Sequence, residues 1–190
     1  MTPHAASVLL VPGLRDAVPA HWQTLLQAAH PAFHSVPAMG REDLAIAPRL
    51  AAIEHAAMSI QGPLVLVAHS GGCIMVAHWA QQTRRTVQGA LLATPPDFES
   101  PMPAGYPSLD ELDRGGWLPV PRGRLPFRSI VTISANDPLG SPDRVAQLAG
   151  QWGSEIVQLG DVGHLNPASG YGEWPQALTL IAQLASPNQP

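Results

Sequence analysis

The 190-residue chain contains no lysine, and all ten of its basic residues are arginine. This absence excludes several classes of enzyme. Without a side-chain amine, the protein cannot form a Schiff base with pyridoxal phosphate or with a carbonyl substrate. It also cannot contain a phosphate-binding loop that ends in Gly-Lys-Ser/Thr, and it cannot use a Ser-Lys catalytic dyad.

Cysteine, charge and long apolar runs are also scarce. Cys73 is the only cysteine, so no disulfide can form within the chain, which is typical of a reducing compartment. The formal net charge of −4 disfavours nucleic acid as a partner. No apolar stretch approaches the ~20 residues of a membrane span, and the first residues lack the basic region of a signal peptide. We therefore expect a cytoplasmic protein with no membrane span.

Hydrophobic residues make up 45% of the chain, and short apolar segments alternate with segments of helical character. This alternation is typical of an α/β fold with a parallel sheet. We expect one domain over residues 1–190, with a mostly parallel sheet of five to six strands and helices on both faces. The predicted strands are 7–11, 64–68, 87–93, 129–134 and 155–159, with a short one near 33–36. The predicted helices are 19–29, 43–59 capped by Asp43, 73–82, 141–150 and 174–185.

Residues 94–127 depart from this alternation. They contain many of the 21 prolines and show neither a helical nor a strand period. A long irregular loop inside a compact domain usually has a function. We expect this irregular, proline-rich loop to form one wall of a pocket.

A serine stands where a predicted strand turns into an apolar helix, in the sequence Ala68-His69-Ser70-Gly71-Gly72. A serine at such a junction, flanked by small residues, is the nucleophile elbow of α/β-hydrolases. Alanine replaces the usual first glycine and is the next smallest residue. The alternative interpretation is that Ser70 only caps the helix that follows.

Two further residues fall just past the ends of later strands, in the order that such hydrolases require. Asp137 follows strand 129–134, and His164 follows strand 155–159. The carboxyl ends of parallel strands are where open α/β sheets place their sites. We therefore predict His164 as the base and Asp137 as the acid. Asp143 and Asp161 are the competing acids, which we interpret as a first-turn helix charge and as a residue too close in sequence to His164.

The roles of these residues follow from charge. Ser70 is a weak nucleophile until His164 takes its proton, and Asp137 would hold the imidazole tautomer. The oxyanion that forms needs two backbone amide donors. We predict the amides of Gly71 and Leu14 for this oxyanion hole, because Gly71 follows the nucleophile and Leu14 lies in the loop after the first strand.

Other residues whose side chains could react or bind a metal ion are interpreted as structural. We expect Cys73 to be a small buried hydrophobe and His69 to be structural. His30 and His34 are four residues apart, but Pro31 breaks the helix that would align them on a metal ion. We expect no metal and no cofactor.

The chain resembles the small serine hydrolases of the retinoblastoma-binding-protein-nine/YdeN family, from Val8 to about Leu184. The matching stretches are VPGL from Val11, HWQ from His21, VAHSGG from Val67, SANDP from Ser134, GHLN from Gly163 and SGYGEWP from Ser169. The resemblance implies a minimal α/β-hydrolase with little or no lid and the triad Ser70, Asp137 and His164. The Leu-x-Cys-x-Glu motif for pocket-protein binding is absent, because Ile74 and Met75 follow Cys73.

These features predict a serine hydrolase of small carboxylic esters that works through an acyl-enzyme. Hydrolysis of an amide or a thioester is open by the same chemistry. The first alternative is a hydrolase fold kept as a catalytically silent binding or scaffold protein. A nucleotide-binding doubly wound domain is a weaker alternative, because the chain has no Gly-x-Gly-x-x-Gly. The physiological substrate and the oligomeric state do not follow from the sequence.

Overall fold

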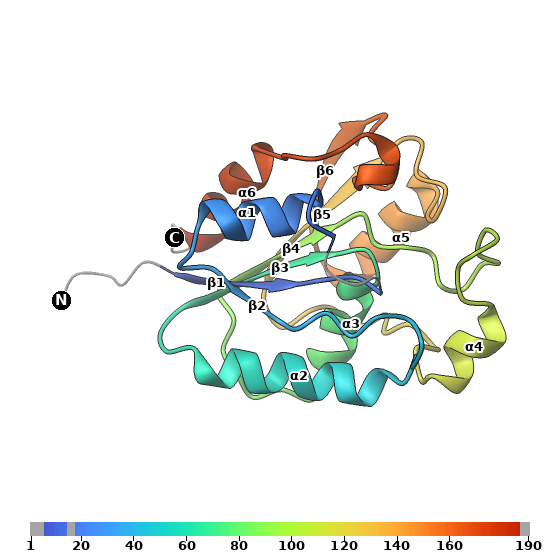
Figure 1. Cartoon of the computed structure of the whole chain (residues 1–190). Coiled ribbons are helices and arrows are strands. Elements are labelled where there is room, and N and C mark those ends of the chain that lie inside the picture. Colours follow the sequence, from blue (N-terminus) through green and yellow to red (C-terminus); the bar gives the residue numbers. More distant parts are fainter. Residues whose placement is uncertain (1–5, 15–17, 187–190) are drawn as a thin grey trace.

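The computed structural model describes residues 6–14 and 18–186 and has one parallel sheet at its centre (Figure 1). Six strands pair in the order β2-β1-β3-β4-β5-β6, and every pairing is parallel. The strands are β1 (Ser7–Val11), β2 (His34–Ser35), β3 (Leu64–His69), β4 (Gly89–Ala93), β5 (Arg128–Ser134) and β6 (Glu155–Gly160). This topology confirms the predicted fold class of a single-domain α/β protein, including the short strand expected near residues 33–36.

Helices cover both faces of the sheet. They are α1 (Trp22–Ala29), α2 (Ile46–Ser59), α3 (Gly71–Trp79), α4 (Leu109–Arg114), α5 (Pro142–Trp152) and α6 (Gln176–Ala185), with a 3₁₀ turn at Pro167–Ser169. Figure 1 shows α1 and α6 on one side of the sheet and α2 and α3 on the other. Side chains of α5 pack in the same hydrophobic cluster as those of α2 and α3. The predicted arrangement of helices on both faces is therefore confirmed.

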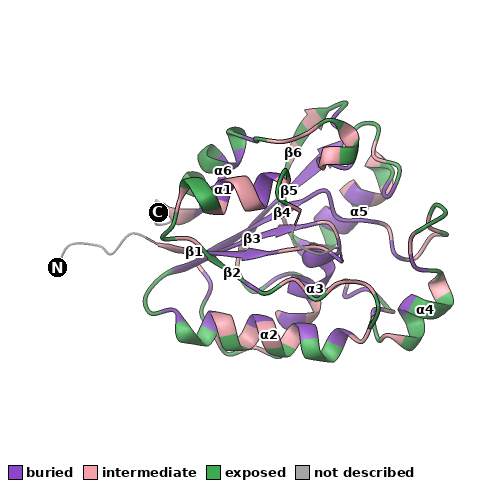
Figure 2. Cartoon of the chain, in the orientation of Figure 1, coloured by how far each residue is buried: buried purple, intermediate pink, exposed green. Residues whose placement is uncertain are grey.

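The central strands are mainly apolar because both of their faces are buried. In β3, Leu64 and Leu66 pack toward α2 and α3, whereas Val65 and Val67 pack toward α1 and α6. All six residues of β3 and all five of β4 are buried. Figure 2 shows these buried central strands between helices whose outer faces are exposed. The apolar runs in the sequence thus arise because each central strand contributes side chains to two hydrophobic layers, one on each side of the sheet.

Two local expectations were wrong. Helix α2 begins at Ile46 with Ala45 as its N-cap, and Asp43 does not cap it. The Oδ1 atom of Asp43 instead accepts the N–H of Ala45 at 2.8 Å, because an aspartate can close a local turn two residues ahead. Residues 94–127 are also not irregular throughout. They contain α4, which starts with a capping box in which Ser108 and Glu111 bind each other's backbone amides.

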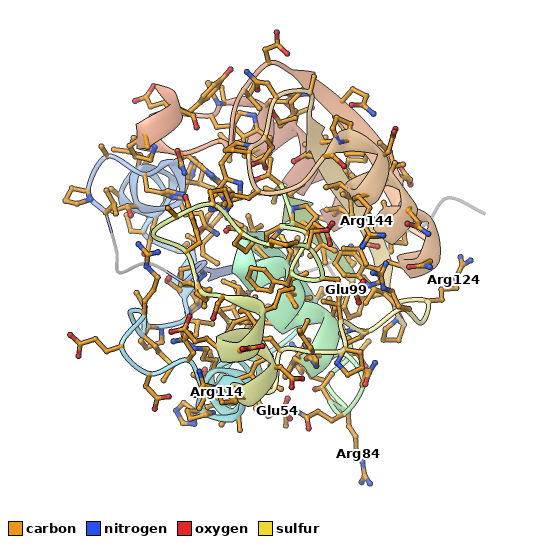
Figure 3. All side chains as sticks on the ribbon, turned by 90° about the vertical axis from the view of Figure 1, so that its right-hand side faces the viewer. Glu54, Arg84, Glu99, Arg114, Arg124 and Arg144 are labelled. Carbon is orange, nitrogen blue, oxygen red and sulfur yellow. The ribbon has the colours of Figure 1, made fainter. Side chains whose placement is uncertain are left out.

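Charged side chains tie the start of the 94–127 segment to α5. Arg144 of α5 donates to Asp97, with Nε 2.8 Å from Oδ2, and lies 3.4 Å from Glu99. Arg122 also pairs with Glu99. In Figure 3 the labelled Arg144 and Glu99 lie near each other, whereas Arg84 extends away from the molecule. The segment is therefore anchored to the sheet-covering helix that precedes β6.

In the described part of the chain, no helix combines the length and the apolar character that crossing a membrane requires.

Candidate active site

The site begins at the sharp turn between β3 and α3. Ser70 sits at this turn with φ 56° and ψ −132°, a backbone conformation that costs energy for a residue with a side chain. Its N–H donates to the carbonyl oxygen of Ala93 at 3.0 Å. A Cβ at Gly72 would lie 2.5 Å from the carbonyl oxygen of Val11, so only glycine lets α3 start this close to β1. This is the geometry of the nucleophile elbow that the sequence predicts.

The loop after β6 carries His164 back over this turn. Gly163 and Leu165, on either side of His164, both have positive φ, 56° and 47°. The loop is held by the N–H of His164, which donates to the Ser169 Oγ at 3.0 Å, and by the N–H of Gly163, which donates to the Asn136 Oδ1 at 2.6 Å. Asn136 belongs to the loop after β5, so the two loops that carry the acid and the base are joined directly.

The structure brings the three predicted residues Ser70, His164 and Asp137 together in one line. The Nε2 of His164 lies 2.7 Å from the Oγ of Ser70, and its Nδ1 lies 2.8 Å from the Oδ2 of Asp137. The side chains of His164 and Asp137 are only 5% and 2% exposed. Since an ionised carboxylate only accepts, Nδ1–H donates to Asp137, and Nε2 is left to accept the hydroxyl proton of Ser70.

The competing acids lie elsewhere. Asp143 stands in the first turn of α5, as expected, and is exposed. Asp161 is also exposed, although it lies three residues before His164. Asp137 is further fixed because its Oδ1 accepts the N–H of Leu139 at 2.9 Å. Both oxygens of this buried carboxylate therefore have a hydrogen-bond donor.

The loop after β1 lies directly against the serine. A Cβ at Gly13 would be 3.1 Å from the Cβ of Ser70 and 3.4 Å from its Oγ. A Cβ at Gly71 would be 3.1 Å from the Cγ of Leu14, so the side chain of Leu14 covers the first turn of α3. The two residues predicted for the oxyanion hole, Leu14 and Gly71, therefore flank Ser70, and their role stays a prediction.

A pocket of about 350 Å³ opens at Ser70 and His164. Most of its walls are apolar, and the 94–127 segment contributes Phe98, Met102 and Tyr106 to them. Arg41 is the one arginine among the described residues that line it, and its Nη1 donates to the carbonyl oxygen of Gly105 at 2.8 Å. This hydrogen bond joins the loop before α2 to the 94–127 segment.

Reasoning from residue types alone missed Gln23 and His21, which both line the pocket. The buried side chain of Gln23 donates from Nε2 to the carbonyl oxygens of Val67, at 3.0 Å, and Val11, at 3.3 Å. It thereby bridges the ends of β1 and β3 next to the elbow. The only sequence signal for these residues is the His-Trp-Gln stretch that carries the family resemblance.

The remaining candidates do not form a site. Cys73 is fully buried, its Sγ donates to the carbonyl oxygen of Ala93 at 3.4 Å, and burial raises the pKa of its thiol well above the ordinary value. A thiol in such surroundings is a poor nucleophile. Within residues 6–14 and 18–186, no group of three or more His, Cys, Asp or Glu could hold a metal ion.

Known structures share this architecture. A proposed YdeN-like hydrolase from Pectobacterium atrosepticum has 26% identity and a TM-score of 0.81, and the match covers 95% of this chain and 91% of that one. The ydeN gene product of Bacillus subtilis has 16% identity and a TM-score of 0.71, over 94% and 98% of the two chains. The thioesterase RedJ of Streptomyces coelicolor has 17% identity and a TM-score of 0.60, over 95% and 89%. The likenesses at 16% and 17% identity concern the fold alone.

No curated protein matches the chain at a significant level. The family model described as serine hydrolase, however, matches residues 8–183, which is nearly the whole chain. The matched residues include Ser70 and the loops that carry Asp137 and His164. The six-stranded parallel sheet agrees with this family assignment. The chain therefore belongs to the serine hydrolase family, within the α/β-hydrolase superfamily.

Proposed function

We propose that the protein is an esterase that hydrolyses small carboxylic esters through a covalent acyl-enzyme. Ser70 is the nucleophile, His164 is the general base and then the general acid, and Asp137 orients the imidazole. The observation that carries this proposal is the position of His164, 2.7 Å from the Oγ of Ser70 and 2.8 Å from the Oδ2 of Asp137. Hydrogen bonds of this length lie within proton-transfer range for a general base.

Acylation begins with transfer of the Ser70 hydroxyl proton to His164. The Oγ of Ser70 attacks the ester carbonyl carbon while the Nε2 of His164 takes the hydroxyl proton, and the carbonyl π electrons move to oxygen. The buried carboxylate of Asp137 stabilises the imidazolium that results. When the tetrahedral intermediate collapses, its C–O bond to the alcohol breaks and His164 returns the proton to the departing alkoxide. The acyl group is then bound to Ser70.

Deacylation repeats these steps with water as the nucleophile. His164 takes a proton from the water, the water oxygen adds to the acyl carbon, and Ser70 leaves as an alcohol after regaining its proton. The products are a carboxylic acid and an alcohol, so atoms and charge balance with water as the only co-substrate. The reaction calls for no metal and no cofactor.

The developing oxyanion is the charge that this site has to stabilise. We assign the two donors to the backbone amides of Gly71 and Leu14. Gly71 begins α3, where backbone amides are not used within the helix and the helix dipole favours negative charge. The loop that carries Leu14 approaches Ser70 closely because Gly13 has no side chain. Removing one such donor typically slows hydrolases by about 10²–10³.

The pocket suggests the class of substrate. A volume of about 350 Å³ lies at the small end of ligand sites, and its apolar walls suit a short hydrocarbon acyl group. Thioesters are the second candidate, because RedJ, whose fold this chain shares, is a thioesterase. The same serine and oxyanion donors serve either leaving group, so the choice between an alcohol and a thiol rests on the rest of the pocket.

A fluorophosphonate probe tests the proposal directly. Wild-type protein should be labelled and Ser70→Ala should not be, because the probe reacts with an activated serine. An unlabelled wild type would favour a catalytically silent binding protein. Equal labelling of Ser70→Ala would assign the nucleophile to another residue. The ratio of kcat/KM for a p-nitrophenyl ester and a thioester with the same acyl chain then decides between the two leaving groups.

A further inference from the structure

Two histidines beside the proposed triad form a second line of hydrogen bonds that ends on the backbone of His164. The Nε2 of His69 lies 2.9 Å from the carbonyl oxygen of His164, and the Nδ1 of His69 lies 3.2 Å from the Nε2 of His21. The Nδ1 of His21 in turn lies 3.2 Å from the backbone N–H of Gln23. His69 immediately precedes Ser70 in the sequence, and His21 is the N-cap of α1. The hydrogen bonds therefore connect the start of α1, through the residue next to the nucleophile, to the backbone of the proposed base.

The partners at the two ends fix the proton on each ring. A carbonyl oxygen only accepts, so the Nε2 of His69 carries its hydrogen and donates to His164. An amide N–H only donates, so the Nδ1 of His21 accepts from Gln23 and the Nε2 of His21 carries the hydrogen. That hydrogen points to the Nδ1 of His69, which is the unprotonated nitrogen of that ring. All three hydrogen bonds therefore agree with a single arrangement, in which both histidines are neutral Nε2–H tautomers.

The surroundings keep both rings neutral. Burial, and then repulsion from His164, lower the pKa of His21 to about 4. Burial lowers the pKa of His69 well below 6.5, with further lowering by His164 and His21. Neutrality matters because the rings of His69 and His164 are 5.0 Å apart. A charge on His69 would oppose the imidazolium that forms on His164 during the reaction.

Aromatic packing holds the two rings in these orientations. The indole of Trp22 stacks on His21 at 5.7 Å and meets the ring of His69 edge-on at 5.9 Å. Trp174 packs edge-on against Trp22, with the two ring centroids 4.9 Å apart. Both tryptophans are buried. These ring contacts favour the orientations in which the two histidines make the hydrogen bonds described above.

From this geometry we propose that His69 is a positioning residue for His164, and that His21 sets the tautomer in which His69 does this. The inference rests on the proposed function, since it assigns His164 as the base. The loop of His164 needs such a hold because the residues on both sides have positive φ. His69, the residue next to the nucleophile, thus holds the backbone of His164. The distance between Ser70 and His164 then depends on this backbone contact as well as on the hydrogen bond between their side chains.

Substitution of His69 tests whether its donor is what matters. Glutamine places an amide N–H the same number of bonds from Cα as the Nε2–H of histidine, whereas leucine removes the donor. We expect His69→Leu to lower kcat by ~10–100-fold, the scale of a small misplacement of catalytic groups, with KM within about twofold. His69→Gln should recover most of this loss. Unchanged kcat in His69→Leu, or equal losses in the two variants, would overturn the proposal. His55→Gln, at an exposed position on α2, is the control.

The tautomers can be read without any variant. Long-range ¹H–¹⁵N NMR of the wild-type protein near pH 7 should show His21 and His69 with protons on Nε2. A proton on the Nδ1 of His69 would overturn the proposal, because His69 would then have no hydrogen to give to His164. His21→Phe should allow the second tautomer of His69 to appear and should lower kcat in the same direction as His69→Leu.

These results separate the two proposals. If Ser70→Ala is still labelled and active, the proposed function fails whatever the His69 variants do. If Ser70→Ala is inactive and His69→Leu matches the wild type, the proposed function stands and the positioning role fails.

Discussion

Gly72 lies against the backbone of Val11, and a Cβ built on it would be 2.5 Å from the Val11 carbonyl oxygen and 2.7 Å from that of Pro12. This contact joins the first turn of α3 to the end of β1. It places the turn that carries Ser70 beside the loop that carries Leu14. Gly72, together with Gly13, therefore helps to set how closely the nucleophile and the proposed oxyanion donors approach each other.

Substitution of Gly72 by alanine should damage both stability and activity. The atoms in the way are backbone oxygens of a buried strand and its loop, which cannot turn aside as a side chain would. We expect a loss of about 2–3 kcal/mol in the free energy of unfolding, together with lower esterase activity. Urea unfolding and ester hydrolysis measure the two effects.

The matched control is Gly150→Ala in α5, where an added Cβ meets nothing within 4 Å. This change should be neutral or stabilise the protein by up to ~1 kcal/mol, because alanine is a better helix former than glycine. Equal stability losses in the two variants would show that the contact with Val11 is not the cause.

The acid of the site can be identified by two asparagine substitutions. Asp137→Asn keeps the size of the side chain but allows the wrong imidazole tautomer, so kcat should fall by about 10⁴. Asp161→Asn removes an exposed carboxylate three residues from His164 and should leave kcat within about twofold of the wild type. A large loss in Asp161→Asn with little effect of Asp137→Asn would reverse the assignment.

Protonation of His21 should contribute to the pH dependence of the free energy of unfolding. The pKa of His21 is about 4 in the folded protein and ~6.5 in an unfolded chain, so between these values the unfolded state binds more protons. The contribution of His21 to stability is thus intact above pH ~6.5 and is lost as the pH falls from there toward 4. We expect the wild type to lose more stability between pH 7 and pH 4 than His21→Gln does, as measured by urea midpoints. An identical pH slope in the two proteins would contradict the lowered pKa.

Most of the fold could be predicted because its central strands, β1, β3, β4 and β5, are buried on both faces. A run such as residues 64–68 is apolar for that reason, and its position two residues before Ser70 located the elbow. The order Ser70, Asp137, His164 could be predicted as well, since each follows a strand and parallel strands end at the same edge. The geometry adds which carboxylate reaches the imidazole.

The choice of one local turn and a contact between distant segments could not be predicted in this way. Asp43 precedes a helical segment and is a good capping residue, but it closes a turn before Ala45 instead. His69 reads as a structural residue, and its bond to the carbonyl oxygen of His164 joins positions 95 residues apart. The local sequence pattern cannot predict such a partner, because every residue has a backbone carbonyl oxygen and the residue type of the acceptor therefore gives no indication of the hydrogen bond.

The 94–127 segment offers a last test, because it lines the pocket and is tied to α5 by Arg144. Burial raises the pKa of Asp97, but hydrogen bonds from Arg144 and Ser100 outweigh this and lower it overall. Arg144→Gln should remove the paired charge from a carboxylate whose side chain is 12% exposed, and the urea midpoint should fall. The difference from the wild type should shrink in high salt, since an ion pair with a partly exposed partner is screened. Arg84→Gln changes an arginine that extends into solvent and should leave the midpoint unchanged (Figure 3). If Arg144→Gln and Arg84→Gln behave alike, the ion pair with Asp97 does not anchor the pocket wall.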